Sequence, residues 1–233
     1  AQNGGYKSNQ IDGDYSFETL YHQLYERDIS FACYYNNISF MMLLQDLPGR
    51  GRMNPFEEFH EDAMAGKLPS FSVVEPMYGK NCDHPPVHPM AGQLLISSVI
   101  DSLAQSPLWD KTMLIIAYDE HGGYYDHVPP PKTQDDRASE GFDQMGFRVP
   151  TQFVGPYVKE KFASNTVYDH ASILAFAQRL WNLGPLNARD AAANDFFDVL
   201  DMERVQRLDP RPPPELPVIV ADEATFDAEP CGT

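Results

Sequence analysis

The chain has 233 residues, 42% hydrophobic and 12% aromatic, so it is long enough to bury a sizeable core as one globular domain. Its 17 Lys and Arg against 34 Asp and Glu give a net charge of −17. Such an acidic surface repels nucleic acid phosphates and argues against a polybasic membrane anchor. No stretch of the sequence approaches the roughly 20 apolar residues of a transmembrane segment.

The ends and the cysteines give little further information. Three cysteines are too few for a disulfide framework and leave the redox compartment open. The chain opens with AQNGGYKSNQ, without an initiator Met or an apolar run. We therefore expect that a segment upstream has been removed.

A helix and a strand are predicted in the first part of the chain. Residues 1–14 are polar and Gly-rich, which is typical of a loop. Ser16 is a candidate helix cap, with Leu20 and Leu24 on one face of the helix that follows. The short run at 29–35 is rich in residues that favour strands, so it predicts a strand.

The next segments continue the alternation of helices and strands. A helix is predicted over about 54–65, because Pro55 suits a first turn and Gly66 suits a helix end. Residues 69–76 are a second strand candidate. Apolar residues at helical spacing predict a helix over about 89–105.

The strongest strand prediction falls on 112–118, a continuous apolar run of the kind seen in strands covered on both faces. A further strand is predicted within 147–158, with a Pro inside it, and a helix over about 170–182. Residues 209–233 are Pro-rich and acidic and predict an extended tail, which leaves 1–208 as the folded unit.

This alternation predicts an α/β fold with a mainly parallel sheet and helices on both faces. Sites in such sheets form beyond the carboxyl ends of the strands. The strand at 112–118 ends directly before Asp119, which therefore stands where chemistry is expected.

A dense group of polar residues follows that strand. Asp119, Glu120 and His121 precede two glycines, which accept the positive φ that a sharp turn needs, and then Asp126 and His127. The carboxylates suit Mg, Mn or Ca, whereas imidazole suits Zn or Fe, so the mixture selects no single metal. The histidines are candidates for binding a phosphate or protonating a leaving oxygen.

An alternative is a hydrogen-bonded turn in which Asp126 orients His127 and Glu120 is solvated. For an arbitrary Asp-Glu pair after a strand that alternative is the better one. The additional histidines and the Gly-Gly pair favour a functional site.

Two other histidine segments remain open to a structural interpretation. In NCDHPPVHP, prolines hold His84 and His88 in a stiff loop, either as a preformed site or as a rigid connector. Cys82 in the same loop is interpreted as an ordinary thiol. In YDHAS, Asp169 is interpreted as a helix cap.

The block YDEHGGYYDHVPPP, residues 118–131, resembles the phosphoesterase family of bacterial phosphatidylcholine-type phospholipases C, plant non-specific phospholipases C and related acid phosphatases. Other segments resemble the family in the same order, over about residues 16–190. They are ETLYHQLYERDISFACYYNNI, KLPSFSVVEPMYG, DHPP, SPLWDKTMLIIAYDEHGG, GFRVPTQFVGPYV and YDHASILAFAQRLWNLG.

The resemblance implies an alkaline-phosphatase-like α/β fold and hydrolysis of phosphate esters through a Ser or Thr phospho-enzyme. It implies that Asp119 and Glu120 are the metal or active-site pair, with a divalent ion (Mg, Mn, Ca or Zn) as cofactor. It implies further that His84 faces the phosphoryl group, that Asp83 orients His84, and that the block histidines His121 and His127 belong to the site. The family's usual export implies a secreted or periplasmic protein.

The chain departs from the family in one respect. It contains no counterpart of the family's Glu-Asn metal pair or of its nucleophile segment, which are expected before Ala1. We therefore expect an N-terminal fragment of the same precursor as a partner, and a phospholipid or similar phosphate ester as substrate. The alternatives are an acid phosphatase and a non-catalytic module that binds phosphate or lipid.

Overall fold

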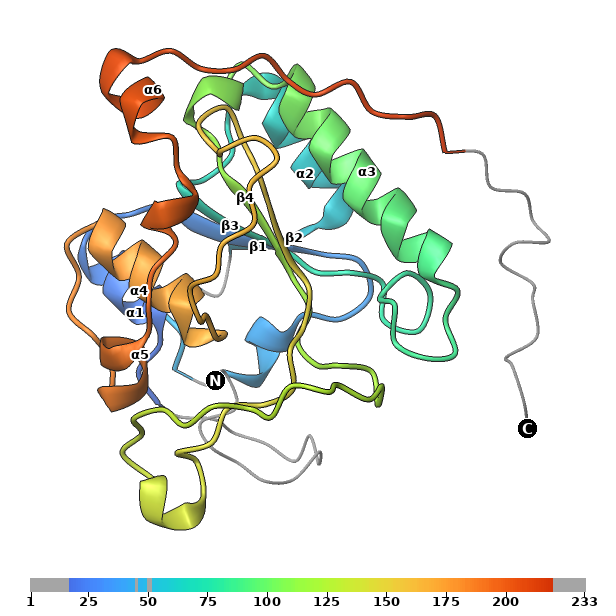
Figure 1. The fold of residues 1–233 in the computed structure, drawn as a ribbon. Helices are drawn as coiled ribbons and strands as arrows, with labels where there is room; N and C mark the ends of the chain where they lie inside the picture. The colour runs from blue at the N-terminus through green and yellow to red at the C-terminus, as the bar shows by residue number, and fades with distance from the viewer. Residues whose placement is uncertain (1–16, 45, 50–51, 220–233) are drawn as a thin grey trace.

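The computed structural model of the chain describes residues 17–44, 46–49 and 52–219, and it contains two separate sheets (Figure 1). Three parallel strands lie in the order β2–β1–β3, with bounds Met53–Pro55, Phe31–Tyr35 and Phe71–Val74. An antiparallel pair is formed by β4, Leu114–Ala117, and β5, Thr151–Val154. The predicted α/β class is confirmed.

Six α-helices within the described residues surround these strands. They are α1 (Leu20–Glu26), α2 (Phe56–Ala65), α3 (Pro89–Gln105), α4 (Ala171–Leu180), α5 (Ala188–Ala192) and α6 (Met202–Arg207). Short 3₁₀ segments lie at Phe40–Leu43, Trp109–Lys111, Ala138–Glu140 and Phe197–Val199.

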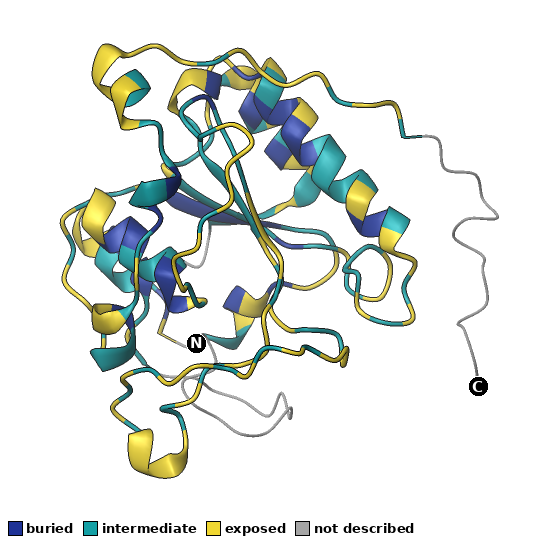
Figure 2. Ribbon diagram, viewed as in Figure 1, coloured by how far each residue is buried: buried dark blue, intermediate teal, exposed yellow. Residues whose placement is uncertain are grey.

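Helices cover both faces of the parallel sheet, and β1 carries the buried residues that join the layers (Figure 2). Successive side chains of a strand point to opposite faces. Phe31 and Cys33 belong to a core cluster shared with α1 and α4, whereas Ala32 and Tyr34 belong to a cluster shared with α2 and α3. The parallel sheet is thus the middle layer of the fold, as the sequence predicted.

Residues at the helix ends determine where several helices begin and end. The helix predicted over about 89–105 is α3, and its N-cap His88 accepts a hydrogen bond at Nδ1 from the backbone N–H of Met90 at 3.1 Å. Gly66 ends α2 with φ of 67°, as its position suggested. The first helix begins at Leu20 with Thr19 as its N-cap; Ser16, the cap expected from the sequence, lies outside the described residues.

The expectation for 112–118 was wrong in one respect. The strand is present as β4, but it pairs antiparallel with β5 and lies outside the parallel sheet. Leu114 and Val154 pack on the core cluster beneath α2 and α3, whereas Ile115 and Phe153 pack on a third cluster around Phe196. The continuous apolar run therefore reflects two apolar contacts, one on each face, and carries no information about strand direction.

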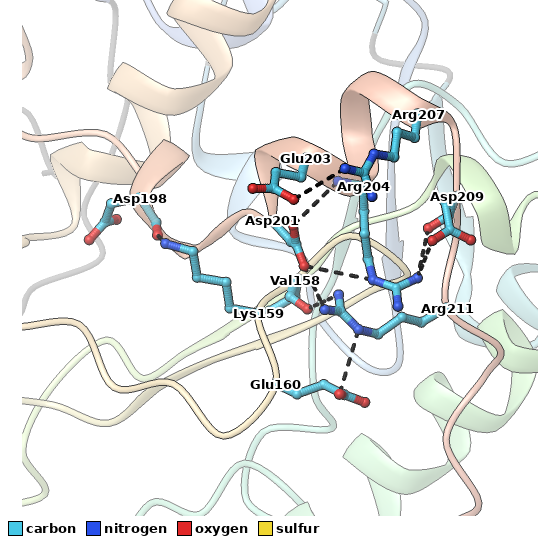
Figure 3. Close-up of polar contacts among 10 residues, drawn as sticks. All are labelled: Val158, Lys159, Glu160, Asp198, Asp201, Glu203, Arg204, Arg207, Asp209 and Arg211. Carbon is cyan, nitrogen blue, oxygen red and sulfur yellow. Dashed lines mark hydrogen bonds and ion pairs between the residues drawn. The ribbon is translucent and has the colours of Figure 1, made fainter.

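The segment after α6 is extended, as predicted for the start of the tail, but it is anchored to the fold through Arg211 (Figure 3). The Arg211 guanidinium donates to the Asp201 carboxylate at 2.7 Å and to the backbone oxygen of Val158 at 2.8 Å. The indole N–H of Trp109 donates to the Arg211 backbone oxygen at 2.8 Å. The tail residues 220–233 lie outside the described residues.

Replacing Arg211 by Ala is therefore expected to lower the melting temperature by about 3–8 °C, since the change removes charge-assisted hydrogen bonds from a largely buried guanidinium. Arg207→Ala is the matched control, because Arg207 and its partner Glu203 are both exposed and 3.5 Å apart. Calorimetry checks both variants. Equal melting temperatures for the two would contradict the anchoring role.

Candidate active site

Two loops meet beyond the end of β4. One follows β4 and carries Tyr118, Asp119 and Glu120, and both of these carboxylates are exposed. The other joins β3 to α3 and carries His84, whose Nε2 lies 3.8 Å from Oε1 of Glu120. The structure therefore brings together three of the predicted site residues from segments far apart in the sequence.

The hydrogen bond of His84 fixes which ring nitrogen is free. Its Nδ1 lies 2.7 Å from the backbone oxygen of Pro85. A carbonyl oxygen only accepts, so Nδ1 carries the hydrogen. The Nε2 atom therefore faces Glu120 and the solvent, where it is available to exchange a proton with a bound oxygen.

The carboxylate of Asp83 has a different partner from the one that the resemblance implied. Its Oδ2 accepts a hydrogen bond from the Tyr118 hydroxyl at 2.8 Å, while His84 is held by Pro85. The role assigned to Asp83, orienting His84 directly, is thus not what the geometry shows. Asp83 instead connects the two loops of the candidate site.

The block histidines make their polar contacts within their own loop. Nδ1 of His121 donates to the backbone oxygen of Tyr124 at 2.8 Å, and its ring packs against the edge of Phe147 at 4.6 Å between centroids. His127 lies 3.8 Å from the Asp126 carboxylate, and its side chain is 79% exposed. Both remain candidate site residues, in the loop that continues from Asp119 and Glu120.

Asp126 joins the first part of the long connection between β4 and β5 to its last part. It accepts hydrogen bonds at 2.8 and 2.7 Å from the guanidinium of Arg148. This guanidinium, together with the backbone N–H of Val128, holds the pKa of Asp126 well below its usual range. The main partner of Asp126 is therefore Arg148 and not His127, so its carboxylate holds the loop together more than it orients His127.

Arg148→Ala is expected to move the pKa of Asp126 back toward its ordinary value, since the first cause of the lowering is removed. A folded-state pKa below the unfolded one stabilises the fold above the ordinary carboxyl pKa, and this stabilisation is lost as the pH falls through the folded value. Carboxyl NMR titration of Asp126 measures the change. An unchanged pKa of Asp126 in the variant would contradict the interaction between Asp126 and Arg148.

A residue of the YDHAS segment also contacts this site, which was not predicted from the sequence. His170, at the start of α4, donates from Nε2 to the backbone oxygen of Tyr118 at 2.8 Å. Asp169 does not cap α4; its carboxylate lies 3.3 Å from Arg189 of α5. The helix-cap interpretation of Asp169 is therefore wrong, and the Asp-His pair links α4 to α5 and to the turn after β4.

The carboxyl end of β3 contributes a further acidic group. Glu75 is buried, accepts from the backbone N–H of Phe40 at 3.1 Å, and has a pKa raised by desolvation. Burial, followed by the charges of Glu75 and Asp119, also raises the pKa of Tyr78.

Of the two cysteines among the described residues, Cys33 is unsuited to act as a nucleophile. Burial raises the pKa of the Cys33 thiol to about 12, which keeps it protonated. Cys82 is partly buried, and its sulfur lies 3.3 Å from the backbone nitrogen of Gly79.

The carboxylates of Asp119 and Glu120 are the candidate metal donors of this site. Within the described residues, no group of three or more His, Cys, Asp or Glu side chains is arranged to hold a metal ion. Asp119 and Glu120 are adjacent, exposed carboxylates, and such oxygens suit hard divalent cations, which take six or more ligands. The two carboxylates are therefore fewer donors than such a cation takes.

A groove of about 570 Å³ lies next to the loop between β3 and α3. Residues 79–81 and 86–88, Phe56 of α2 and the first half of α3 line it. His84, Asp119 and Glu120 are absent from its lining, although the groove and His84 share one loop.

Comparison with known proteins decides the family. The model of the "Phosphoesterase family" matches residues 2–184 of the chain. The chain belongs to the phosphoesterase family. Relatives include the non-specific phospholipases C6 and C1 of Arabidopsis thaliana, which are 34% and 35% identical over 94% and 80% of this chain. The hemolytic phospholipase C of Pseudomonas aeruginosa is 27% identical over 87% of it.

The matches also show how much of these phosphoesterases the chain represents. It spans 48% and 41% of the two plant proteins and 31% of the bacterial one. The family predicted from the sequence is confirmed, and the fold described above is consistent with the alkaline-phosphatase-like architecture that the resemblance implied.

Proposed function

We propose that the chain supplies one side of the active site of a phosphate-ester hydrolase of the phospholipase C type. The observation that carries the proposal is the meeting of His84 with Glu120 beside Asp119, in a phosphoesterase whose relatives are named phospholipases C. The substrate is a phospholipid or a similar phosphodiester. The products are an alcohol, diacylglycerol for a phospholipid, and a phosphorylated head group.

His84 is the acid of this reaction. Cleavage of a phosphate ester leaves an oxygen that needs a proton, and a positioned imidazole supplies one. Because Nδ1 is held by the Pro85 carbonyl, the Nε2 atom is the one that delivers the proton. Oε1 of Glu120 lies 3.8 Å from this Nε2 atom.

Asp119 and Glu120 would hold a divalent cation if one is bound at this site. Such an ion polarises a phosphoryl oxygen and helps to ionise an attacking hydroxyl. The exposed position of both carboxylates leaves their oxygens free for this role, apart from the bond that Oδ1 of Asp119 accepts from the Glu120 backbone at 3.0 Å.

The remaining ligands and the Ser or Thr nucleophile come from an N-terminal fragment of the same precursor. Two observations support this inference. The chain spans 48% and 41% of two plant relatives. Within the part of the chain that the structure describes, β3 pairs with β1 alone and β4 with β5 alone, so each has an edge free to pair with another strand. "Full-length protein" below means this chain together with that fragment.

The localisation that we propose is secretion or export to the periplasm, as the family resemblance implies. Among the described residues, no helix is both long and apolar enough to span a membrane. Cell fractionation tests the proposal, and recovery of the full-length protein in the cytoplasm would contradict it.

The function is tested by incubating the full-length protein with phosphatidylcholine vesicles and a divalent cation. Phosphocholine and diacylglycerol should appear in equal amounts. Choline and phosphatidic acid would indicate cleavage on the other side of the phosphate and would contradict the proposal. Binding of vesicles without any product would instead support a non-catalytic module.

A further inference from the structure

The backbone of Asp83 has an unusual conformation. Its φ is 59°, in the left-handed region that non-glycine residues adopt rarely and short polar residues most readily. The residue lies in the loop before α3, one position ahead of His84. This conformation places its carboxylate against the first turns of α3.

Gly92 makes this placement possible. A Cβ atom at residue 92 would lie 2.1 Å from Oδ1 of Asp83 and 2.5 Å from its Cγ, far closer than atoms can approach. Oδ1 is buried and, among the described residues, has no hydrogen-bond partner. Asp83 lies against the first turns of α3, where the helix dipole favours negative charge. A buried carboxylate oxygen without a hydrogen-bond partner, packed this closely against a helix, calls for a functional reason.

The other oxygen of the Asp83 carboxylate shows what this position against α3 makes possible. Oδ2 accepts the hydrogen bond from the Tyr118 hydroxyl at 2.8 Å, and Tyr118 directly precedes Asp119 and Glu120. The Tyr118 backbone oxygen is held by His170 at 2.8 Å. Tyr118 is therefore fixed by its side chain to the α3 side and by its backbone to α4.

We propose that Asp83 is a positioning residue for the hydrolase: seated against Gly92, it holds the Tyr118 hydroxyl and so sets the distance between His84 and Glu120. The inference rests on the proposed function, because it assigns a task to a residue of that site. Asp83 acts as a hydrogen-bond acceptor for Tyr118, and its charge is not required by His84.

Four variants of the full-length protein test this role, assayed with p-nitrophenyl phosphorylcholine. Tyr118→Phe and Asp83→Ala each remove the hydrogen bond and should lower kcat about 10- to 100-fold, with KM changed less than about twofold, since small misplacements of reacting groups are that costly. Asp83→Asn keeps an acceptor oxygen and suits the left-handed backbone, so it should keep kcat within about fivefold of wild type.

Gly92→Ala is the fourth variant and provides a double-mutant cycle. It should lower kcat in the wild-type background, because the new methyl group displaces the carboxylate. In the Asp83→Ala background it should have no further effect. Gly184→Ala is the matched control, because a Cβ there meets nothing within 4 Å.

Two results would overturn the proposal. One is an Asp83→Asn protein as impaired as Asp83→Ala beside a Tyr118→Phe protein of wild-type kcat, which would assign Asp83 a charge-based role. The other is additivity of Gly92→Ala and Asp83→Ala. If the full-length protein has no hydrolase activity at all, the proposed function fails by itself. The same cycle measured by thermal unfolding then decides whether Asp83, Gly92 and Tyr118 are coupled.

Discussion

The Asp119→Ala variant of the full-length protein is expected to lose about three orders of magnitude in kcat/KM toward phosphodiesters, the scale on which removal of an electrostatic contact to the reacting group acts. Asp119 lies two residues beyond the end of β4 and is exposed, so its carboxylate is accessible to a substrate. Removing it deletes a ligand of the proposed cation and leaves Glu120 as the remaining carboxylate of the pair.

This loss should come without unfolding. Asp119 contributes to no buried cluster, so the melting temperature should change by no more than a surface substitution changes it. Glu61→Ala, an exposed carboxylate on α2, is the matched control and should leave kcat/KM unchanged. An Asp119→Ala protein that hydrolyses phosphodiesters at the wild-type rate would remove Asp119 from the active site.

The His84→Asn variant is expected to lose about 10²–10⁴-fold in kcat, the range that general acid catalysis contributes. The Asn side-chain amide can take the place of Nδ1–H and donate to the Pro85 carbonyl, so the loop keeps its hydrogen bond. Only the Nε2 atom that faces Glu120 is lost. The loss should be smaller for substrates with a p-nitrophenol leaving group, since such an oxygen needs less protonation.

His88→Asn is the control for His84. His88 is exposed in the same loop and caps α3 by accepting from the Met90 backbone N–H, a task that Asn performs equally well. This variant should keep wild-type activity. If His84→Asn kept it too, even with an alkyl leaving group, His84 would not be the acid.

Local signals explain why some elements could be predicted from the sequence. The bounds of α3 follow from Pro89 at its start and from apolar residues at helical spacing, and the α2 end follows from Gly66. The direction of β4 could not be predicted, because an apolar run indicates two covered faces and not the orientation of a neighbour. Helices α5 and α6 are too short to show a period of 3.6 residues.

In the candidate site, too, some features could be predicted from the sequence and others could not. Asp119, Glu120 and His84 stand in dense polar blocks beside a strand end and a proline-rich loop, so residue types and position pointed to them. The contacts that hold them do not show in the sequence. Gly92 sits within a helix, Tyr118 reads as the last residue of a strand, and His170 is 52 positions away from the carbonyl that it holds. Only the packing of α3 and α4 around the turn reveals these contacts.

Initial rates of the full-length protein, with a divalent cation, on p-nitrophenyl phosphorylcholine and p-nitrophenyl phosphate show whether these loops form a catalytic site. We predict turnover of the diester, faster than that of the monoester, and its loss in Asp119→Ala. Turnover of the monoester alone would indicate an acid phosphatase. No turnover of either substrate would contradict the assignment of a catalytic site to these loops.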